Sequence, residues 1–117
     1  MNKLIEQVSN LNDLIIQGQG LKAFDLYYDD DVIMQENNQM EYLGKKLNRK
    51  RVAAFFQGIT AFRSAKPLHV TIGEKITMVE WAFDLTHKDL GLINYNKVVV
   101  QEWENGKVIK ERIYYGS

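Results

Sequence analysis

Two residues near the C-terminus, Asn105 and Gly106, constrain the fold more than any other part of the sequence. They separate two long runs rich in β-branched and aromatic residues, 92–104 and 107–115. Both central residues of a type I′ turn need a positive φ, and the Asn-Gly pair meets this requirement well. The sequence therefore predicts an antiparallel hairpin with a two-residue loop.

A two-residue loop also fixes which side chains share a face of this hairpin. One face would carry Asn96, Val98, Val100, Glu102, Glu104, Lys107, Ile109, Glu111, Ile113 and Tyr115. The other face would carry Lys97, Val99, Gln101, Trp103, Val108, Lys110, Arg112 and Tyr114. A bulged three-residue loop would reverse these faces, and the inferences that depend on them.

Glu111 lies in the mostly apolar middle of the first face, which we expect to meet the helices and line the interior. Because burial disfavours a charged carboxylate, such a residue is either paired or has a raised pKa. Glu102 lies diagonally across on the same face, so two carboxylates could approach one cavity. In the alternative arrangement, Glu102 lies at a wet edge and Glu111 pairs with a neighbouring Arg or Lys.

The second face of the hairpin combines basic residues with two large aromatic ones, Trp103 and Tyr114. A flat sheet face that exposes such rings is suited to a protein contact, although it could also be a solvated surface. We therefore predict a homodimer formed through the outer face of the sheet.

In the rest of the chain, helical patterns come first and strand patterns later. Apolar residues at helical spacing predict helices at about 2–17 and 21–28, and a third from the N-cap Asn48 to a point before Pro67. Strands are predicted at 32–36, 68–72 and 76–85 in addition to the hairpin. This order, without β-α-β alternation, indicates an α+β fold with a mainly antiparallel sheet.

Composition narrows the class of function. The 117 residues fit a single domain, 1–117, and fifteen basic residues balance fifteen acidic ones, so no overall field attracts nucleic acid or a membrane surface. The absence of cysteine excludes thiolate metal sites, and two distant histidines argue against a zinc site. With no apolar run near the roughly 20 residues of a membrane span, and no signal-peptide pattern, we expect a cytoplasmic protein that needs no metal or cofactor.

Three further residues are candidates for an interior site. Glu36 has the parity of the apolar positions 32 and 34, so it would point inward at a cavity rim unless the strand end is exposed. Tyr28 could direct its hydroxyl into the cavity, or simply belong to the core. Glu80 lies outside if its odd-numbered neighbours 79, 81 and 83 face the core, and inside in the reverse arrangement.

Several segments also resemble a known family. They are 27–37 (YYDDDVIMQEN), Gly44-Lys45, Glu80-Trp81 and 103–115 (WENGKVIKERIYY). Together they resemble SnoaL-like proteins of the nuclear-transport-factor-2-like superfamily over nearly the whole chain. The resemblance implies three N-terminal helices packed on a strongly curved sheet, forming a cone around a cavity for a small apolar or partly polar molecule, often in a dimer. The superfold also contains ketosteroid isomerases, polyketide cyclases and members without known catalysis.

From these observations we expect a single SnoaL-like domain that binds a small molecule in an interior pocket. The pocket residues would be Tyr28, Glu36, Asn96 and Tyr115 as ligand contacts, with Glu111 and Glu80 as acid or base. If the protein is an enzyme, these groups permit cofactor-independent isomerisation, cyclisation or dehydration of a carbonyl compound. The alternative is a non-catalytic dimerisation or protein-interaction module whose cavity is filled by its own aromatic residues.

Overall fold

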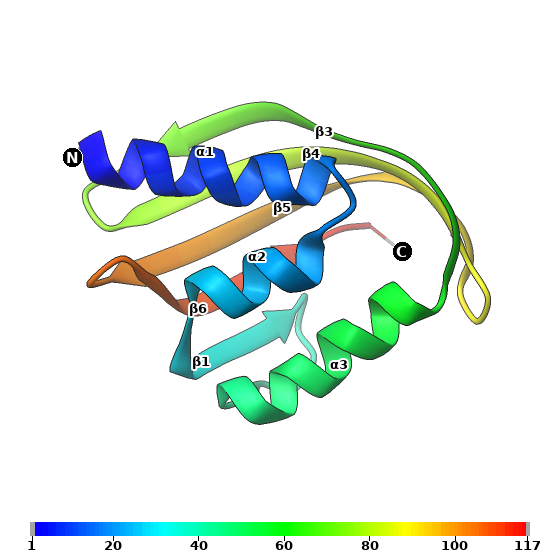
Figure 1. Cartoon of the computed structure of the whole chain (residues 1–117), viewed down its shortest axis with the longest axis horizontal. Coiled ribbons are helices and arrows are strands. Elements are labelled where there is room, and N and C mark those ends of the chain that lie inside the picture. The colour runs from blue at the N-terminus through cyan, green and yellow to red at the C-terminus, as the bar shows by residue number, and fades with distance from the viewer. Residues whose placement is uncertain (1, 117) are drawn as a thin grey trace.

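The computed structural model describes residues 2–116, which form three helices and six strands (Figure 1). In chain order they are α1 (Asn2–Ile16), α2 (Gly20–Tyr27), β1 (Tyr28–Glu36), β2 (Tyr42–Leu43), α3 (Lys45–Gln57), β3 (Ile59–Ile72), β4 (Ile76–His87), β5 (Gly91–Glu104) and β6 (Lys107–Tyr114). The predicted α+β class with three helices is confirmed, whereas the short strand β2 had no sequence signal.

The strands form one mixed sheet in the order β2-β1-β6-β5-β4-β3. β1 and β6 are parallel, and the other neighbours are antiparallel. Figure 1 shows the long strands bending around the helices, which lie in the hollow of the sheet. The sheet is not closed, because β2 and β3 remain as its two edges. The predicted cone of helices on a curved, mainly antiparallel sheet is therefore confirmed.

The apolar stripe of α1 faces the sheet, as its spacing predicted. Val8 and Leu11 are 2% and 1% exposed, and they pack into one core with Phe24 of α2 and Trp81 of β4. Burying this stripe is what holds α1 in place, since an isolated helix of its length is marginal in water. Among residues 2–116, no helix is both long and apolar enough to cross a membrane.

The third helix differs from its prediction at both ends. It begins at Lys45 with Gly44 as N-cap, so Asn48 lies in the first turn, where its buried amide donates to the carbonyl oxygens of Tyr42 and Gly44. It ends at Gln57, because the chain turns at Gly58 against the ring of His87 and continues as β3. A Cβ at Gly58 would lie 2.3 Å from Nε2 of His87, so only glycine permits this close approach.

The last hairpin has the predicted loop but not the predicted register. Asn105 and Gly106 have φ values of 51° and 77°, and Glu104 pairs with Lys107. A β-bulge then shifts the register by one residue, so that Gln101, rather than Val100, pairs with Glu111. As a result, the interior receives the odd-numbered residues of β5 together with Glu111 of β6.

The structure also changes the surface that was predicted to form a dimer. Trp103 is only 3% exposed and donates its indole N–H to Thr77, so it belongs to the core. Tyr114 does lie at the surface, 43% exposed. The outer face therefore presents one of the two aromatic rings on which the dimer prediction depended, and the prediction itself remains untested.

Candidate functional site

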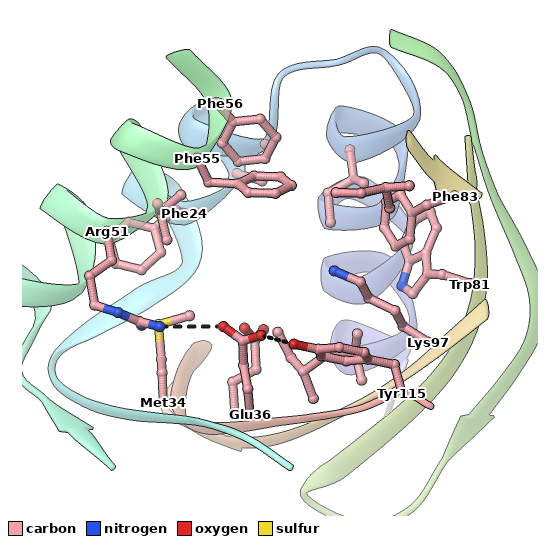
Figure 2. Close-up of a pocket in the computed structure, with 18 of the residues that line it drawn as sticks. Phe24, Met34, Glu36, Arg51, Phe55, Phe56, Trp81, Phe83, Lys97 and Tyr115 are labelled. Carbon is pink, nitrogen blue, oxygen red and sulfur yellow. Dashed lines mark hydrogen bonds and ion pairs between the residues drawn. The ribbon is translucent and has the colours of Figure 1, made fainter. Parts of the chain in front are cut away.

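A cavity of about 260 Å³ lies between the helices and the inner face of the sheet. Six aromatic rings provide much of its apolar lining: Phe24, Phe55, Phe56, Phe62, Trp81 and Phe83. Figure 2 shows Phe55 and Phe56 on the helical side, with Trp81 and Phe83 facing them from the sheet. An apolar cavity of about 150 Å³ holds benzene, and pockets for drug-sized ligands begin near 300 Å³. The cavity therefore suits a molecule of one or two rings.

A buried polar network, the Glu111 cluster, lies in the wall of this cavity and consists of Tyr28, Gln101 and Glu111. Tyr28 donates its hydroxyl hydrogen to Oε1 of Glu111, and Gln101 Nε2 donates to the same oxygen at 2.9 Å. Two further hydrogen bonds orient Gln101. Thr77 donates to its Oε1 at 3.3 Å, and Trp103 donates to Thr77 at 2.9 Å. Within residues 2–116, no hydrogen bond reaches Oε2 of Glu111, so that oxygen is available to a ligand.

The surroundings of the Glu111 cluster keep its acidic groups protonated to higher pH. Burial raises the pKa of Glu111, and the hydrogen bonds from Tyr28 and Gln101 oppose this shift only in part. Burial also raises the pKa of Tyr28 well above its ordinary value, and the charge of Glu111 adds to the effect. Among the described residues Glu111 forms no salt bridge, and the charge of Lys97 opposes the rise in its pKa only in part.

A second polar group, the Glu36 cluster, consists of Glu36, Arg51 and Tyr115 and is partly exposed. Glu36 lies 3.3 Å from the Arg51 guanidinium and accepts a 2.8 Å hydrogen bond from the Tyr115 hydroxyl (Figure 2). This hydrogen bond, with burial, raises the pKa of Tyr115 to about 12. Tyr95 stacks on Tyr115 with ring centroids 5.6 Å apart. The cluster therefore gives one end of the cavity a polar, hydrogen-bonding border.

Lys97 of β5 adds an amine to the same cavity (Figure 2). Its ammonium lies 5.3 Å from the ring centroids of both Phe83 and Tyr115. Burial lowers the pKa of Lys97, although the charges of Glu36 and Glu111 partly oppose the shift. The cavity thus contains an acid and an amine whose pKa values move toward each other.

The structure brings four of the predicted site residues to the cavity, namely Tyr28, Glu36, Glu111 and Tyr115. The remaining candidates lie elsewhere and require correction. Glu80 lies on the outer face of β4, where its carboxylate is 2.8 Å from Nδ1 of His69, because Val79 and Trp81 face the core.

The residues of β5 and β6 near the bulge also differ from their predicted places. Asn96 is exposed, because the inner face of β5 is the one that carries Trp103 and Lys97. Glu102 does not approach the cavity mouth and instead lies 2.9 Å from Arg112 in an ion pair. Of the two acids expected at one mouth, only Glu111 lines the cavity.

Three polar residues at the cavity, Arg51, Lys97 and Gln101, were not predicted as site residues. Lys97 and Gln101 were predicted on the outer face of the hairpin, but the structure buries the pair Trp103 and Val108, which shares their face. Arg51 of α3 has its guanidinium 3.6 Å above the ring of Tyr42, and it contacts Glu36. Within residues 2–116, no cluster of three or more His, Asp or Glu side chains forms a possible metal site.

Comparison with known proteins identifies both the sequence family and the fold. The model of the SnoaL-like domain family matches residues 5–115. A candidate SnoaL-like polyketide cyclase from Mesorhizobium loti superposes with a TM-score of 0.82 at 22% identity, covering 96% of this chain and 98% of that one. A second candidate cyclase, from Jannaschia sp. CCS1, has a TM-score of 0.81 at 16% identity and covers 96% and 84% of the two chains.

The same architecture occurs in a protein described with a different activity. An LEH-like epoxide hydrolase from M. tuberculosis superposes with a TM-score of 0.78 at 16% identity, covering 98% of this chain and 84% of that one. At such identities these structures show a shared fold only, and they do not establish a shared reaction. The comparison with curated proteins gave no match.

Proposed function

This chain belongs to the SnoaL-like domain family, and from that premise we propose that its cavity binds a small carbonyl compound on which Glu111 transfers a proton. The observation that carries the proposal is the position of Glu111, a buried acid in the wall of an aromatic cavity. Such an arrangement would serve an isomerase, cyclase or dehydratase reaction that needs no cofactor.

The lining supports binding of a mainly apolar ligand with one polar end. Aromatic rings such as Phe55 and Trp81 offer flat surfaces to a ring, while Tyr28 and Glu111 offer hydrogen bonds to a polar group. Pockets of this kind, mostly apolar with a few convergent polar groups, are typical of small-molecule sites. A ligand carbonyl near the Glu111 cluster would accept a hydrogen bond from the protonated acid.

The raised pKa of Glu111 supports a role in proton transfer. A general acid or base works best when its pKa lies near the operating pH, and burial moves Glu111 in that direction. Tyr28 is protonated at neutral pH. When Glu111 has lost its proton, the hydrogen bond that Tyr28 donates stabilises the carboxylate. Glu111 could thereby remove a proton next to the ligand carbonyl and return it at another position.

The alternative function, a non-catalytic interaction module, requires an interior filled by its own side chains. A remaining volume of about 260 Å³ beside a buried acid counts against this alternative. Burying a carboxyl group in a closed core costs stability without benefit unless a ligand or reaction uses it.

The two tryptophans provide a direct binding test, because Trp81 lines the cavity and Trp103 does not. In a Trp103→Phe variant, 4-iodoacetophenone should quench the remaining Trp81 fluorescence in a saturable way, since its ring fits the cavity and iodine quenches on contact. A Trp81→Phe variant, which retains only Trp103, should show weak quenching that rises linearly. Equal and linear quenching in both variants would contradict the proposed binding.

We expect a Gly20→Ala substitution to narrow the cavity. A Cβ at Gly20 would lie 2.1 Å from Cζ of Phe56, so the phenyl ring must move away from α2. Overpacking of this kind costs roughly 1–3 kcal/mol of stability. The variant should bind 4-iodoacetophenone more weakly in the Trp103→Phe background. Gly116→Ala is the control, because a Cβ there meets no atom within 4 Å, and unchanged affinity for Gly20→Ala would place the ligand elsewhere.

A further inference from the structure

Lys97 lies in the middle of β5, opposite Trp81 of the neighbouring strand β4. Its side chain extends into the cavity. Four aromatic rings surround its ammonium group at centroid distances of 5.3–5.8 Å: Phe55, Phe83, Tyr95 and Tyr115. Figure 2 shows the amine directed toward the centre of the cavity, between the sheet and α3. A ligand in the cavity therefore has to lie close to this nitrogen.

The amine of Lys97 has no polar partner among residues 2–116, since no hydrogen bond or ion pair involves it. The charged and titratable groups that border the cavity are Glu36 of β1, Arg51 of α3, Tyr28 and Glu111 of the Glu111 cluster, and Tyr95 and Tyr115 beside Lys97. Among the described residues, neither Glu36 nor Glu111 lies within ion-pair distance of this amine. The amine of Lys97 is therefore available to interact with a ligand.

The basic side chains elsewhere in the sheet provide a contrast. Lys110 lies 3.5 Å from Glu41, and Arg63 lies 2.8 Å from Asp84, so each has an acidic partner. In an apolar site without such a partner, a lysine loses its proton more readily, and desolvated lysines act as amine nucleophiles toward carbonyl groups. The burial that lowers the pKa of Lys97 acts in this direction.

We propose that Lys97 condenses with an aldehyde or ketone bound in the cavity to form a Schiff base. This inference rests on the proposed function, because it specifies how the same cavity would hold and activate a carbonyl compound. It names a covalent contact between the ligand and β5 that Glu111 alone does not provide. The class of substrate is thereby narrowed to compounds with an unhindered carbonyl carbon next to one or two rings.

The chemistry balances without a further reactant. The lone pair of Nζ forms a bond to the carbonyl carbon, the π electrons of the carbonyl move to oxygen, and a proton shifts from nitrogen to oxygen to give a carbinolamine. A second proton, supplied by the carboxyl group of Glu111, converts the hydroxyl to water, which leaves as the iminium forms. The iminium then withdraws electrons from the adjacent C–H bond, and the Glu111 carboxylate is the base that can remove that proton.

Reductive trapping tests the proposal on the intact protein. Incubation with 4-iodobenzaldehyde and cyanoborohydride at pH 7, followed by peptide mass spectrometry, should find Lys97 labelled faster than any other lysine, because the cavity holds the aldehyde beside Nζ and burial raises the fraction of free amine. A Lys97→Met variant should lose this label, and the matched Lys110→Met variant should retain it. Even labelling of all lysines would overturn the proposal.

Two further measurements separate this inference from the proposed function. If 4-iodoacetophenone quenches Trp81 but Lys97 is not trapped, the cavity binds ligands and the Schiff base is wrong. If Lys97→Met abolishes binding of 4-iodobenzoate while wild-type protein shows no trapping, Lys97 is an anion-binding residue and the Schiff base is again wrong. If no quenching occurs at all, the proposed function itself fails. Selective trapping together with saturable quenching supports both.

Discussion

Replacing Glu111 with glutamine should slow proton exchange on a bound ketone by about 10²–10⁴-fold, the usual contribution of a positioned general acid or base. Glutamine keeps the size of the side chain and an oxygen that can accept the hydrogen bonds of Tyr28 and Gln101, but it cannot exchange a proton. The reaction to follow is deuterium uptake into the methyl group of 4-iodoacetophenone in D₂O, measured by NMR. A Glu111→Gln variant that exchanges at the wild-type rate would remove Glu111 from the mechanism.

The same variant should change how stability depends on pH. Burial raises the pKa of Glu111 in the folded state above its unfolded value, so the folded state binds the proton more tightly. This contribution to stability is complete below the unfolded pKa and is lost as pH rises through the folded pKa. Glu111→Gln lacks that loss, so its free energy of unfolding relative to wild type should increase from acidic to neutral pH.

Urea denaturation at a series of pH values measures this difference. Glu74→Gln provides the control, because Glu74 is exposed between β3 and β4 and lies outside the cavity. Parallel profiles for wild type and Glu111→Gln would mean that the carboxyl group titrates as it does in water. In that case the acid would be too weakly perturbed for the proposed role, even if it lines the cavity.

The prediction of Glu111 illustrates how far the sequence determines this site. The turn at Asn105 and Gly106 requires positive φ at both residues, and this local requirement can be read from two letters of the sequence. The bulge that follows shifts the register between Glu102 and Trp103, and it has no comparable two-residue signal. Glu111 reached the interior as predicted, but with Gln101 rather than Val100 beside it.

The choice of the inner face explains why Lys97 and Asn96 exchanged places. Alternation along a strand predicts which residues share a face, but not which face is inside. Val98 and Val100 favoured one choice by their apolar character, while the structure leaves Val98 37% exposed and directs Lys97 inward. A lysine in an aromatic cavity contradicts the usual distribution of charge, and such exceptions are expected where a protein has a functional site.

The predicted end of the third helix was wrong for a different reason. Ile59 and Phe62 continue the helical spacing of α3, so the sequence predicted one helix up to Pro67. In the structure, Pro67 lies within β3, which is an edge strand, where a residue without an N–H group is tolerated. Helical spacing over a few residues therefore could not exclude a strand, and tertiary contacts at Gly58 decided the outcome.

Trp81→Ala should lower the free energy of unfolding by about 3–5 kcal/mol, the usual cost of removing a buried tryptophan. Trp81 is 2% exposed and stacks on Phe83 with centroids 5.4 Å apart. This loss is a large part of the roughly 5–15 kcal/mol that stabilises a small domain. Because Trp81 forms a wall of the cavity, the space it leaves should join the existing volume. Urea denaturation measures the loss. If the alanine variant does not fold, Trp81→Phe takes its place, and it should retain much of the wild-type stability.

The enlarged cavity makes the effect specific to ligands. A two-ring ketone such as 2-acetylnaphthalene should stabilise Trp81→Ala more than it stabilises the wild-type protein, since binding to the folded state alone raises stability. Trp103→Ala is the matched control, because Trp103 is 3% exposed and similarly large but lies outside this cavity. Its stability should fall by a comparable amount without recovery on adding the ketone. Equal recovery of both variants would show that the ketone binds outside the cavity, whereas recovery confined to Trp81→Ala would locate the bound ring against β4.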